Sequence, residues 1–165
     1  MSNKWHTDRV ADDPLESYDL TFLLGLSFQL LIEQFVQRLN AAGYHDLRPV
    51  HGFAFQAIGP QGATSSELAQ RLGMTKQAAG QMIDYLESRG YLRRQGHPLG
   101  GRRRLVMLTE RGLAHLAEAG AILRDVEAGW AARLDDGRLA ELRADLITLI
   151  RGAAGDAVPA LRPVW

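Results

Sequence analysis

The sequence contains no cysteine among its 165 residues, which excludes disulfides, thiolate metal sites and cysteine nucleophiles. It lacks an uninterrupted apolar run of the roughly 18 to 20 residues that a membrane span needs. Residues 1–17 also lack the apolar core of a signal peptide, so we expect a cytoplasmic protein. There is no G-x-S-x-G motif, phosphate-binding glycine loop or catalytic triad. We therefore expect no enzymatic activity and no cofactor.

The formal net charge of zero conceals an uneven distribution. Residues 64–112 contain nine Lys or Arg and four Asp or Glu, so this segment carries +5 and the remainder carries −5. A basic segment between acidic flanks favours a module that binds a polyanion, carried on a separate scaffold. Chance clustering on a solvated surface gives the same count, so charge alone leaves both interpretations open.

Apolar residues recur every three or four positions in four segments outside the centre of the basic part, which predicts helices there. The first helix, over residues 17–42, is apolar on more than one face, as helices that also pack against a second chain often are. A shorter helix over 47–59 has a proline in its first turn. Thr109 is expected to cap a third, long helix, and the last helix covers 138–151.

The basic segment itself has the pattern of a helix-turn-helix. A capping box of Thr64 and Glu67 begins one helix, and a tight glycine-containing turn separates it from the next helix, 75–89. The strand-like residues 91–94 and 104–108 then form a hairpin. The order helix, helix, helix, turn, helix, hairpin is that of a winged helix-turn-helix.

In this motif 75–89 is the recognition helix, and its exposed face carries polar residues suited to DNA. Glutamine pairs bidentately with adenine, and lysine binds phosphate or guanine. A glycine inside the helix costs about 1 kcal/mol, which a close approach to DNA would explain. An ordinary solvated helix face has the same composition. The residues concerned are Lys76, Gln77, Gly80, Gln81 and Asp84.

The hairpin loop carries three consecutive arginines, Arg102, Arg103 and Arg104. A loop beside a recognition helix lies over the phosphate backbone, and its tip can reach the minor groove, whose negative potential attracts arginine. Strand alternation lets at most two of the three share the DNA-facing side. A solvated basic patch is the alternative.

The stretches "TSSELAQRLGMTKQAAGQMIDYLESRGYLRR" and "HPLGGRRRLVMLTERG" resemble the winged-helix core of the multiple antibiotic resistance regulator (MarR) family. The resemblance covers about residues 18–152. It implies an obligate homodimer held by the first and the last two helices, with two winged lobes that bind successive major grooves of a palindromic operator. Most members are repressors, and small phenolic or other aromatic ligands release many of them. Such ligands often bind between the dimerisation helices and the DNA-binding lobe.

One departure from the family pattern falls in the hairpin loop. The family's wing usually reads close to D-P-x-D-x-R, whereas this chain has His97 and Gly100 where the acidic residues would stand. In the family the acidic residues help to hold the wing arginines. Their loss leaves two hypotheses: a loop that becomes ordered only on DNA, or a weak DNA contact that is compensated elsewhere.

We therefore expect a mainly α fold with a small β-hairpin wing, in which a winged helix-turn-helix lobe joins a helical dimerisation region. The expected parts are a flexible arm over 1–16 with Trp5, the dimerisation region over 17–46 and 109–152, the DNA-binding lobe over 47–108 and a tail over 153–165. The expected DNA-binding residues are Ser65, Ser66, Thr75, Lys76, Gln77, Gly80, Gln81, Arg102, Arg103 and Arg104.

An effector site is a further hypothesis. Phe28, His51 and Phe55 could line a pocket in which an aromatic acid or a phenol stacks and hydrogen-bonds. Packing of the junction between the first two helices is the alternative explanation of these residues. His45 and His51 straddle the start of the second helix, but no histidine pair has a metal-ligand spacing, so we expect no metal.

The function expected from the sequence is that of a sequence-specific transcriptional regulator. It would bind double-stranded DNA as a homodimer, repress from a palindromic operator, respond to a small aromatic or phenolic effector and have no membrane partner. The alternative is a winged-helix module for protein–protein contact without specific DNA binding. DNA affinity that falls steeply with salt favours the first, whereas dimer formation without DNA binding favours the second.

Overall fold

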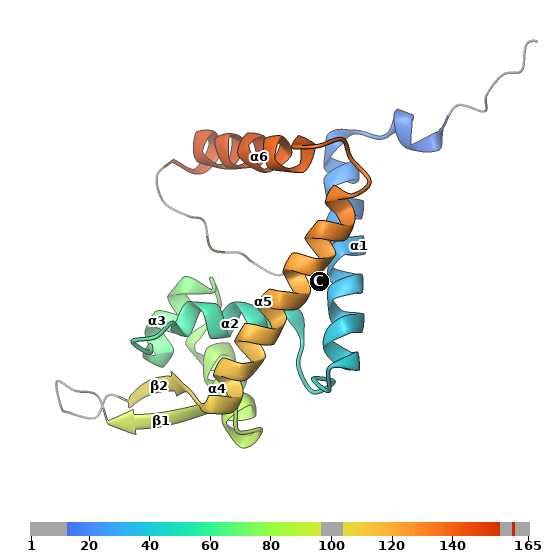
Figure 1. Ribbon diagram of the computed structural model, residues 1–165. Coiled ribbons are helices and arrows are strands. Elements are labelled where there is room, and N and C mark those ends of the chain that lie inside the picture. Colours follow the sequence, from blue (N-terminus) through green and yellow to red (C-terminus); the bar gives the residue numbers. More distant parts are fainter. Residues whose placement is uncertain (1–12, 97–103, 156–159, 161–165) are drawn as a thin grey trace, which may run out of the picture.

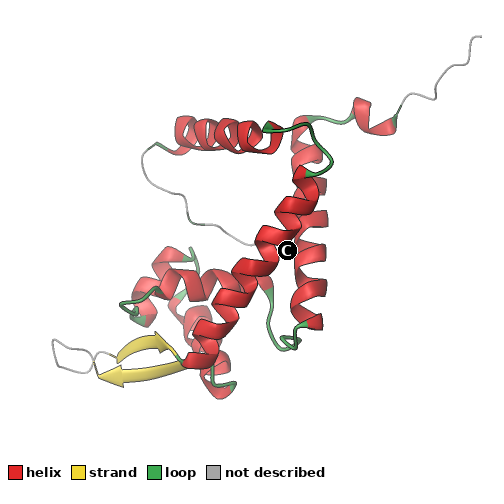
Figure 2. Cartoon of the chain, in the orientation of Figure 1, coloured by secondary structure: helices red, strands yellow, loops and turns green. Residues whose placement is uncertain are grey.

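The computed structural model describes residues 13–96, 104–155 and 160 (Figure 1). Helices dominate these residues, and one antiparallel hairpin accompanies them, which confirms the mainly α winged helix-turn-helix fold (Figure 2). The elements in chain order are η1 (Pro14–Ser17), α1 (Leu20–Ala41), α2 (Pro49–Ile58), α3 (Ser65–Arg71), α4 (Lys76–Ser88), β1 (Leu92–Gly96), β2 (Arg104–Leu108), α5 (Glu110–Ala131) and α6 (Arg138–Ala154).

The long helix α5 connects the two regions of the molecule (Figure 1). One end of α5 meets the cluster formed by α2, α3, α4 and the β1–β2 hairpin, which we call the winged lobe. Helix α1 runs alongside α5, and α6 follows beyond the far end of α5 and extends away from it. We call α1, α6 and the far half of α5 the helical arm. The recognition helix and the helical arm therefore lie at opposite ends of one continuous helix.

Buried apolar side chains hold the winged lobe together. Leu68 of α3, Ile83 of α4 and Phe55 of α2 are all fully buried in one core, which Val106 of β2 completes. The predicted capping box is confirmed, because Thr64 N–H donates to Glu67 Oε2 (2.7 Å) and Glu67 N–H donates to Thr64 Oγ1 (3.3 Å). Helix α3 thus begins at a fixed residue on a closed core.

The hairpin is attached to the lobe at its base. Strands β1 and β2 pair from Leu92 with Leu108 to Gly96 with Arg104. A further bridge joins Val106 to Ala63, just before α3. Gly62 is required there, because its φ of +78° is left-handed and a Cβ would lie 2.8 Å from the carbonyl oxygen of Val106.

The helical arm is apolar but open. Within the fully described helices α1 and α6, Leu39 alone is buried. By length and composition α1 is also apolar enough to cross a membrane. However, Leu31 and Phe35 join Leu39 in a small core with α5, so one side of α1 is already packed on the chain.

Several element ends differ from the expected ones. Residues 14–17, at the end of the expected flexible arm, form the 3-10 helix η1, in which Asp13 accepts a hydrogen bond from Leu15 N–H (3.0 Å). Strand β1 continues to Gly96, and α6 continues to Ala154. Trp5 and most of the expected C-terminal tail lie outside the described residues.

Candidate nucleic-acid interface

One face of α4 carries the predicted base-reading side chains. Thr75 caps the helix, because its Oγ1 accepts a hydrogen bond from Ala78 N–H (3.1 Å). Ala79, Ile83 and Leu86 are buried against the lobe, so the opposite face is turned outward. The structure brings the predicted residues together on and beside that face: Ser66, Thr75, Lys76, Gln77 and Gln81 are exposed, and Ser65 and Gly80 are half-buried.

Nothing inside the molecule explains the glycine in the middle of α4. A Cβ added at Gly80 would meet no described atom within 4 Å. Glycine nevertheless costs a helix about 1 kcal/mol relative to alanine. Free space at this position is what the close approach of an outside molecule to the helix backbone requires.

The base of the hairpin carries further exposed positive charge. Arg93 of β1 and Arg104 of β2 are both exposed, and Arg93 donates a hydrogen bond to Gln95 (2.9 Å). Arg102 and Arg103, with His97 and Gly100, lie outside the described residues. The two hypotheses for the loop therefore stay predictions.

Arg94 is a basic residue of this segment that is engaged within the protein. Its Nη2 lies 2.5 Å from Oδ1 of Asp84, and Glu87 accepts both from the Arg94 guanidinium and from the Arg94 N–H (3.1 Å). The hydrogen bond to Asp84 is the main cause that raises the pKa of Arg94, so the pair stays charged. Arg94 thus ties β1 to the recognition helix. The sequence analysis counted Arg94 only as part of the net charge. Asp84 and Glu87, two acids one turn apart on α4, were a signal that a nearby arginine would pair with them.

The MarR family model matches residues 45–103, which run from the loop before α2 through α3, α4 and β1 into the wing loop. Over these residues the chain is similar to the MarR family. In this likeness α4 corresponds to the recognition helix and the hairpin to the wing.

Solved structures of MarR-family proteins resemble the whole fold. A probable transcriptional regulator from Pseudomonas aeruginosa is 26% identical, with a TM-score of 0.65 over 82% of this chain and 99% of that chain. MepR, which regulates the Staphylococcus aureus multidrug efflux pump MepA, is 17% identical, with a TM-score of 0.67 over 82% and 99%. The repressor CouR is 25% identical, with a TM-score of 0.66 over 79% and 92%. No curated protein sequence matches the chain.

A hydrogen-bonded junction joins the winged lobe to α5. The buried Tyr91 donates from its hydroxyl to Asp46 (3.0 Å) and accepts from Arg111 (3.0 Å), whose guanidinium carbon lies 4.3 Å from the ring centroid. Arg111 also donates to the carbonyl of Arg89 (2.9 Å). Thr109 donates to the carbonyls that follow α4 and accepts from an N–H of the first turn of α5. Burial is the main cause that raises the pKa of Tyr91.

This junction was not predicted from the sequence. Its members come from the α1–α2 loop, the start of β1 and the start of α5, and no local pattern connects them. Gly112 is the one residue whose type reflects the junction, because a Cβ there would lie 2.4 Å from the carbonyl oxygen of Tyr91. A glycine in the first turn of a helix was a signal of this close approach.

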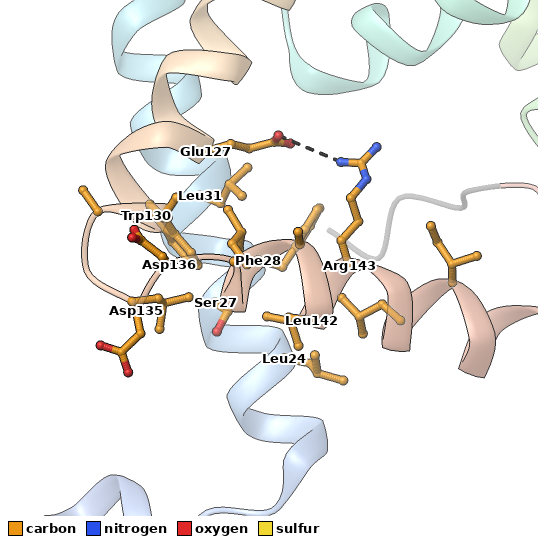
Figure 3. A pocket seen from close by; sticks show the side chains of 18 of the residues that line it. Leu24, Ser27, Phe28, Leu31, Glu127, Trp130, Asp135, Asp136, Leu142 and Arg143 are labelled. Carbon is orange, nitrogen blue, oxygen red and sulfur yellow. Dashed lines mark ion pairs between the residues drawn. The ribbon is translucent and has the colours of Figure 1, made fainter.

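The three predicted effector residues lie in two different places. Phe28 lines a groove of about 1020 Å³ between α1, α5 and α6, opposite Trp130 and Leu142 (Figure 3). Phe55 is fully buried against Tyr91, with ring centroids 5.8 Å apart. His51 is also buried, and its Nδ1 accepts from the N–H of Arg48 (3.1 Å), while burial lowers its pKa. The effector site therefore stays a prediction for these residues.

The groove beside Phe28 is open and mostly apolar. Figure 3 shows Leu24 of α1 and Leu142 of α6 on facing walls, with an ion pair between Glu127 and Arg143 (4.0 Å) at its edge. Among the described residues no group of three or more His, Asp or Glu side chains could hold a metal ion.

Proposed function

We propose that this protein is a DNA-binding transcriptional regulator of the MarR type that places α4 in the major groove. The observation that carries the proposal is the outward face of α4, where Lys76, Gln77 and Gln81 surround a glycine with free space above it. The base of the hairpin adds Arg93 and Arg104. CouR, one quarter identical, is a transcriptional repressor bound to a 23-mer DNA duplex, which supports repression by contact with DNA.

A homodimer on a palindromic operator is the second part of the proposal. Leu20 and Phe22 of α1 and Leu149 of α6 are each more than 60% exposed, and a soluble monomer rarely leaves so much apolar surface in water. A second copy covers these faces better than a membrane does, because the apolar surface continues from α1 to α6 across the groove of Figure 3. A two-fold pair of lobes then reads two inverted half-sites.

Release by a small aromatic or phenolic effector is the third part. Ligands that bind where the winged lobe meets α1 and α5 can lower the affinity for DNA only if they bind the DNA-free form more tightly. The two regions meet through α5 and the junction around Tyr91, so a site near them is suitably placed.

The test first selects DNA duplexes that the protein binds from a random pool. Fluorescence anisotropy then measures the affinity for these duplexes at several salt concentrations. Affinity should fall steeply as salt rises, since phosphate contacts release counterions. Gln81→Ala should cost roughly 1–3 kcal/mol of binding free energy and relax base preference. Gln37→Ala, an exposed glutamine on α1, is the matched control and should leave binding unchanged. Binding that never prefers one sequence would contradict operator recognition.

A further inference from the structure

Asp46, in the loop between α1 and α2, is contacted by three parts of the chain near the end of α4. Its carbonyl oxygen accepts a hydrogen bond from the hydroxyl of Tyr85 on α4 (2.6 Å). Its Oδ1 accepts one from the hydroxyl of Tyr91, just after α4 (3.0 Å), and its Oδ2 lies 3.7 Å from Nη2 of Arg111 at the start of α5. We propose that Asp46 is the positioning residue that fixes the orientation of α4 on α5, and with it the preference for one DNA sequence. The inference rests on the proposed function.

The two tyrosine hydroxyls make the attachment of α4 directional. The buried Ala79 and Ile83 keep α4 on the lobe, but apolar contacts have little directional preference. Hydrogen bonds weaken steeply when the donor and the acceptor are misaligned. Tyr85 reaches Asp46 from within α4, and Tyr91 reaches it from the segment that follows. Together they fix the end of α4 relative to the loop between α1 and α2.

Arg111 extends this attachment from Asp46 to α5. Its guanidinium donates to the hydroxyl of Tyr91 (3.0 Å) and to the carbonyl of Arg89, the C-cap residue of α4 (2.9 Å). The side chain of Asp46 is 21% exposed, so its attraction to Arg111 is partly shielded from water and stronger than that of a fully exposed pair. An uncharged side chain at position 46 would leave Arg111 without this anion and would loosen its hold on both tyrosine and carbonyl.

Base reading depends on this orientation because the predicted base-reading end of α4 is distant from Asp46. Lys76 lies about 13 Å from Tyr85 along the helix axis, so a rotation of α4 by about 5° at Tyr85 moves Lys76 by about 1 Å. Hydrogen bonds to bases span only about 2.7–3.2 Å and do not survive such a shift. Phosphate contacts carry no sequence information and persist over longer distances. Loss of the Asp46 contacts should therefore lower specific DNA binding more than non-specific binding.

The negative charge of Asp46 gives the test a clear sign. An acid in a lobe that binds DNA opposes the attraction to phosphates, so its removal strengthens DNA binding if charge alone matters. A positioning role predicts the opposite result for a selected duplex. Asp46→Asn is the informative change, because the amide has nearly the size of the carboxylate and the variant keeps the backbone carbonyl that Tyr85 uses.

The experiment measures the affinity of the full chain for a selected duplex and for a scrambled duplex of the same length and composition, well below the Tm. With Asp46→Asn, the affinity for the selected duplex should fall roughly tenfold, as the loss of one base contact allows. The affinity for the scrambled duplex should stay the same or rise. Glu110→Gln, which removes an exposed acid next to Arg111, is the matched control and should leave the ratio of the two affinities within about twofold.

Two tyrosine variants keep the test decisive if Asp46→Asn is poorly folded. Tyr85→Phe and Tyr91→Phe each remove one hydroxyl from Asp46 and should each lower the affinity for the selected duplex by roughly threefold to tenfold. Tyr91→Phe combined with Asp46→Asn should cost less than the two separate losses together, because both changes remove the same contact. A ratio of affinities that is unchanged in Asp46→Asn, or in Tyr85→Phe if Asp46→Asn does not fold, would overturn the inference even if the Tm falls.

The same measurements separate this inference from the proposed function. If the wild type and Asp46→Asn prefer the selected duplex equally, the inference fails and the proposed function stands. If the wild type prefers no duplex, the proposed function fails and the inference fails with it, because there is no sequence preference for Asp46 to set.

Discussion

The winged lobe and the helical arm contain the same kinds of apolar residue but place them differently. In the lobe Leu68, Ile83 and Phe55 are fully buried. In the arm Phe22 is 64% exposed and Leu149 is 61% exposed. The core of the lobe is therefore complete within one chain, whereas the apolar faces of the arm are open in the single chain and would be covered in the proposed dimer. A matched pair of substitutions measures this difference directly.

Leu68→Ala should produce the largest effect, because it opens a cavity in the closed core. We expect the free energy of unfolding to fall by about 2–5 kcal/mol. Leu149→Ala, the same change on the exposed face of α6, should stay within about 0.5 kcal/mol in dilute protein. Urea unfolding at low protein concentration measures both. Equal costs would mean that the arm is already packed in the single chain.

A drop in pH should lower the free energy of unfolding through His115, which lies where the two regions meet. Its folded pKa of about 4 lies below the ordinary value of 6.5, so the unfolded state binds the proton more readily between these pH values. This contribution is fully present above pH 6.5 and is lost as the pH falls towards 4, by about 3 kcal/mol in total. Unfolding curves across this range should show the loss, and His115→Phe should flatten it.

Charge on the open face should separate the two copies. Phe22→Asp with Leu149→Asp places carboxylates on surface that the proposed dimer buries. The dissociation constant of the dimer should therefore rise at least tenfold, which corresponds to about 1.4 kcal/mol. Sedimentation velocity over a concentration series measures it. Gln70→Asp, on the exposed side of α3 in the lobe, is the control. A monomeric wild type at high concentration would refute the dimer itself.

Gly80→Ala should have a smaller effect on stability than Leu68→Ala, and one of the opposite sign. Because there is room for the methyl group, the substitution should raise the free energy of unfolding by about 1 kcal/mol. It should nevertheless weaken DNA binding, since the methyl group occupies the space above the helix. Gly129→Ala on α5, which also has room, should stabilise without any change in DNA affinity. A Gly80→Ala protein with unchanged DNA affinity would show that α4 does not approach DNA closely there.

The winged lobe was the more predictable region, because local signals define it. The capping box at Thr64 and the turn at Gly73, whose φ is +61°, mark the helix-turn-helix without any tertiary information. The polar face expected for residues 75–89 also lies opposite the buried Ala79, Ile83 and Leu86 of α4. Each of these features involves residues within a few positions of one another.

Contacts between distant segments were not predictable from the sequence. The clamp of Arg94 on Asp84 and Glu87 joins a strand to a helix, and the bridge between Ala63 and Val106 spans more than forty residues. Sequence reasoning grouped Phe28 with residues of α2, whereas the structure sets it in the groove beside α6. Periodicity shows that a residue is apolar, but the packing angle between helices decides which neighbour it meets.

The continuous helix α5 also acts as a lever. Its 22 residues span about 33 Å, and the hydrogen bonds of Thr109 and Arg111 fasten one end directly to the segment that follows the recognition helix. Tilting such a rod by about 10° at the far end moves the near end by about 6 Å. Successive half-sites of a palindrome lie roughly 34 Å apart, so a displacement of this size takes a lobe out of register with its groove. In the proposed dimer, a small change where the two copies meet would therefore be enough to decide whether both lobes reach DNA.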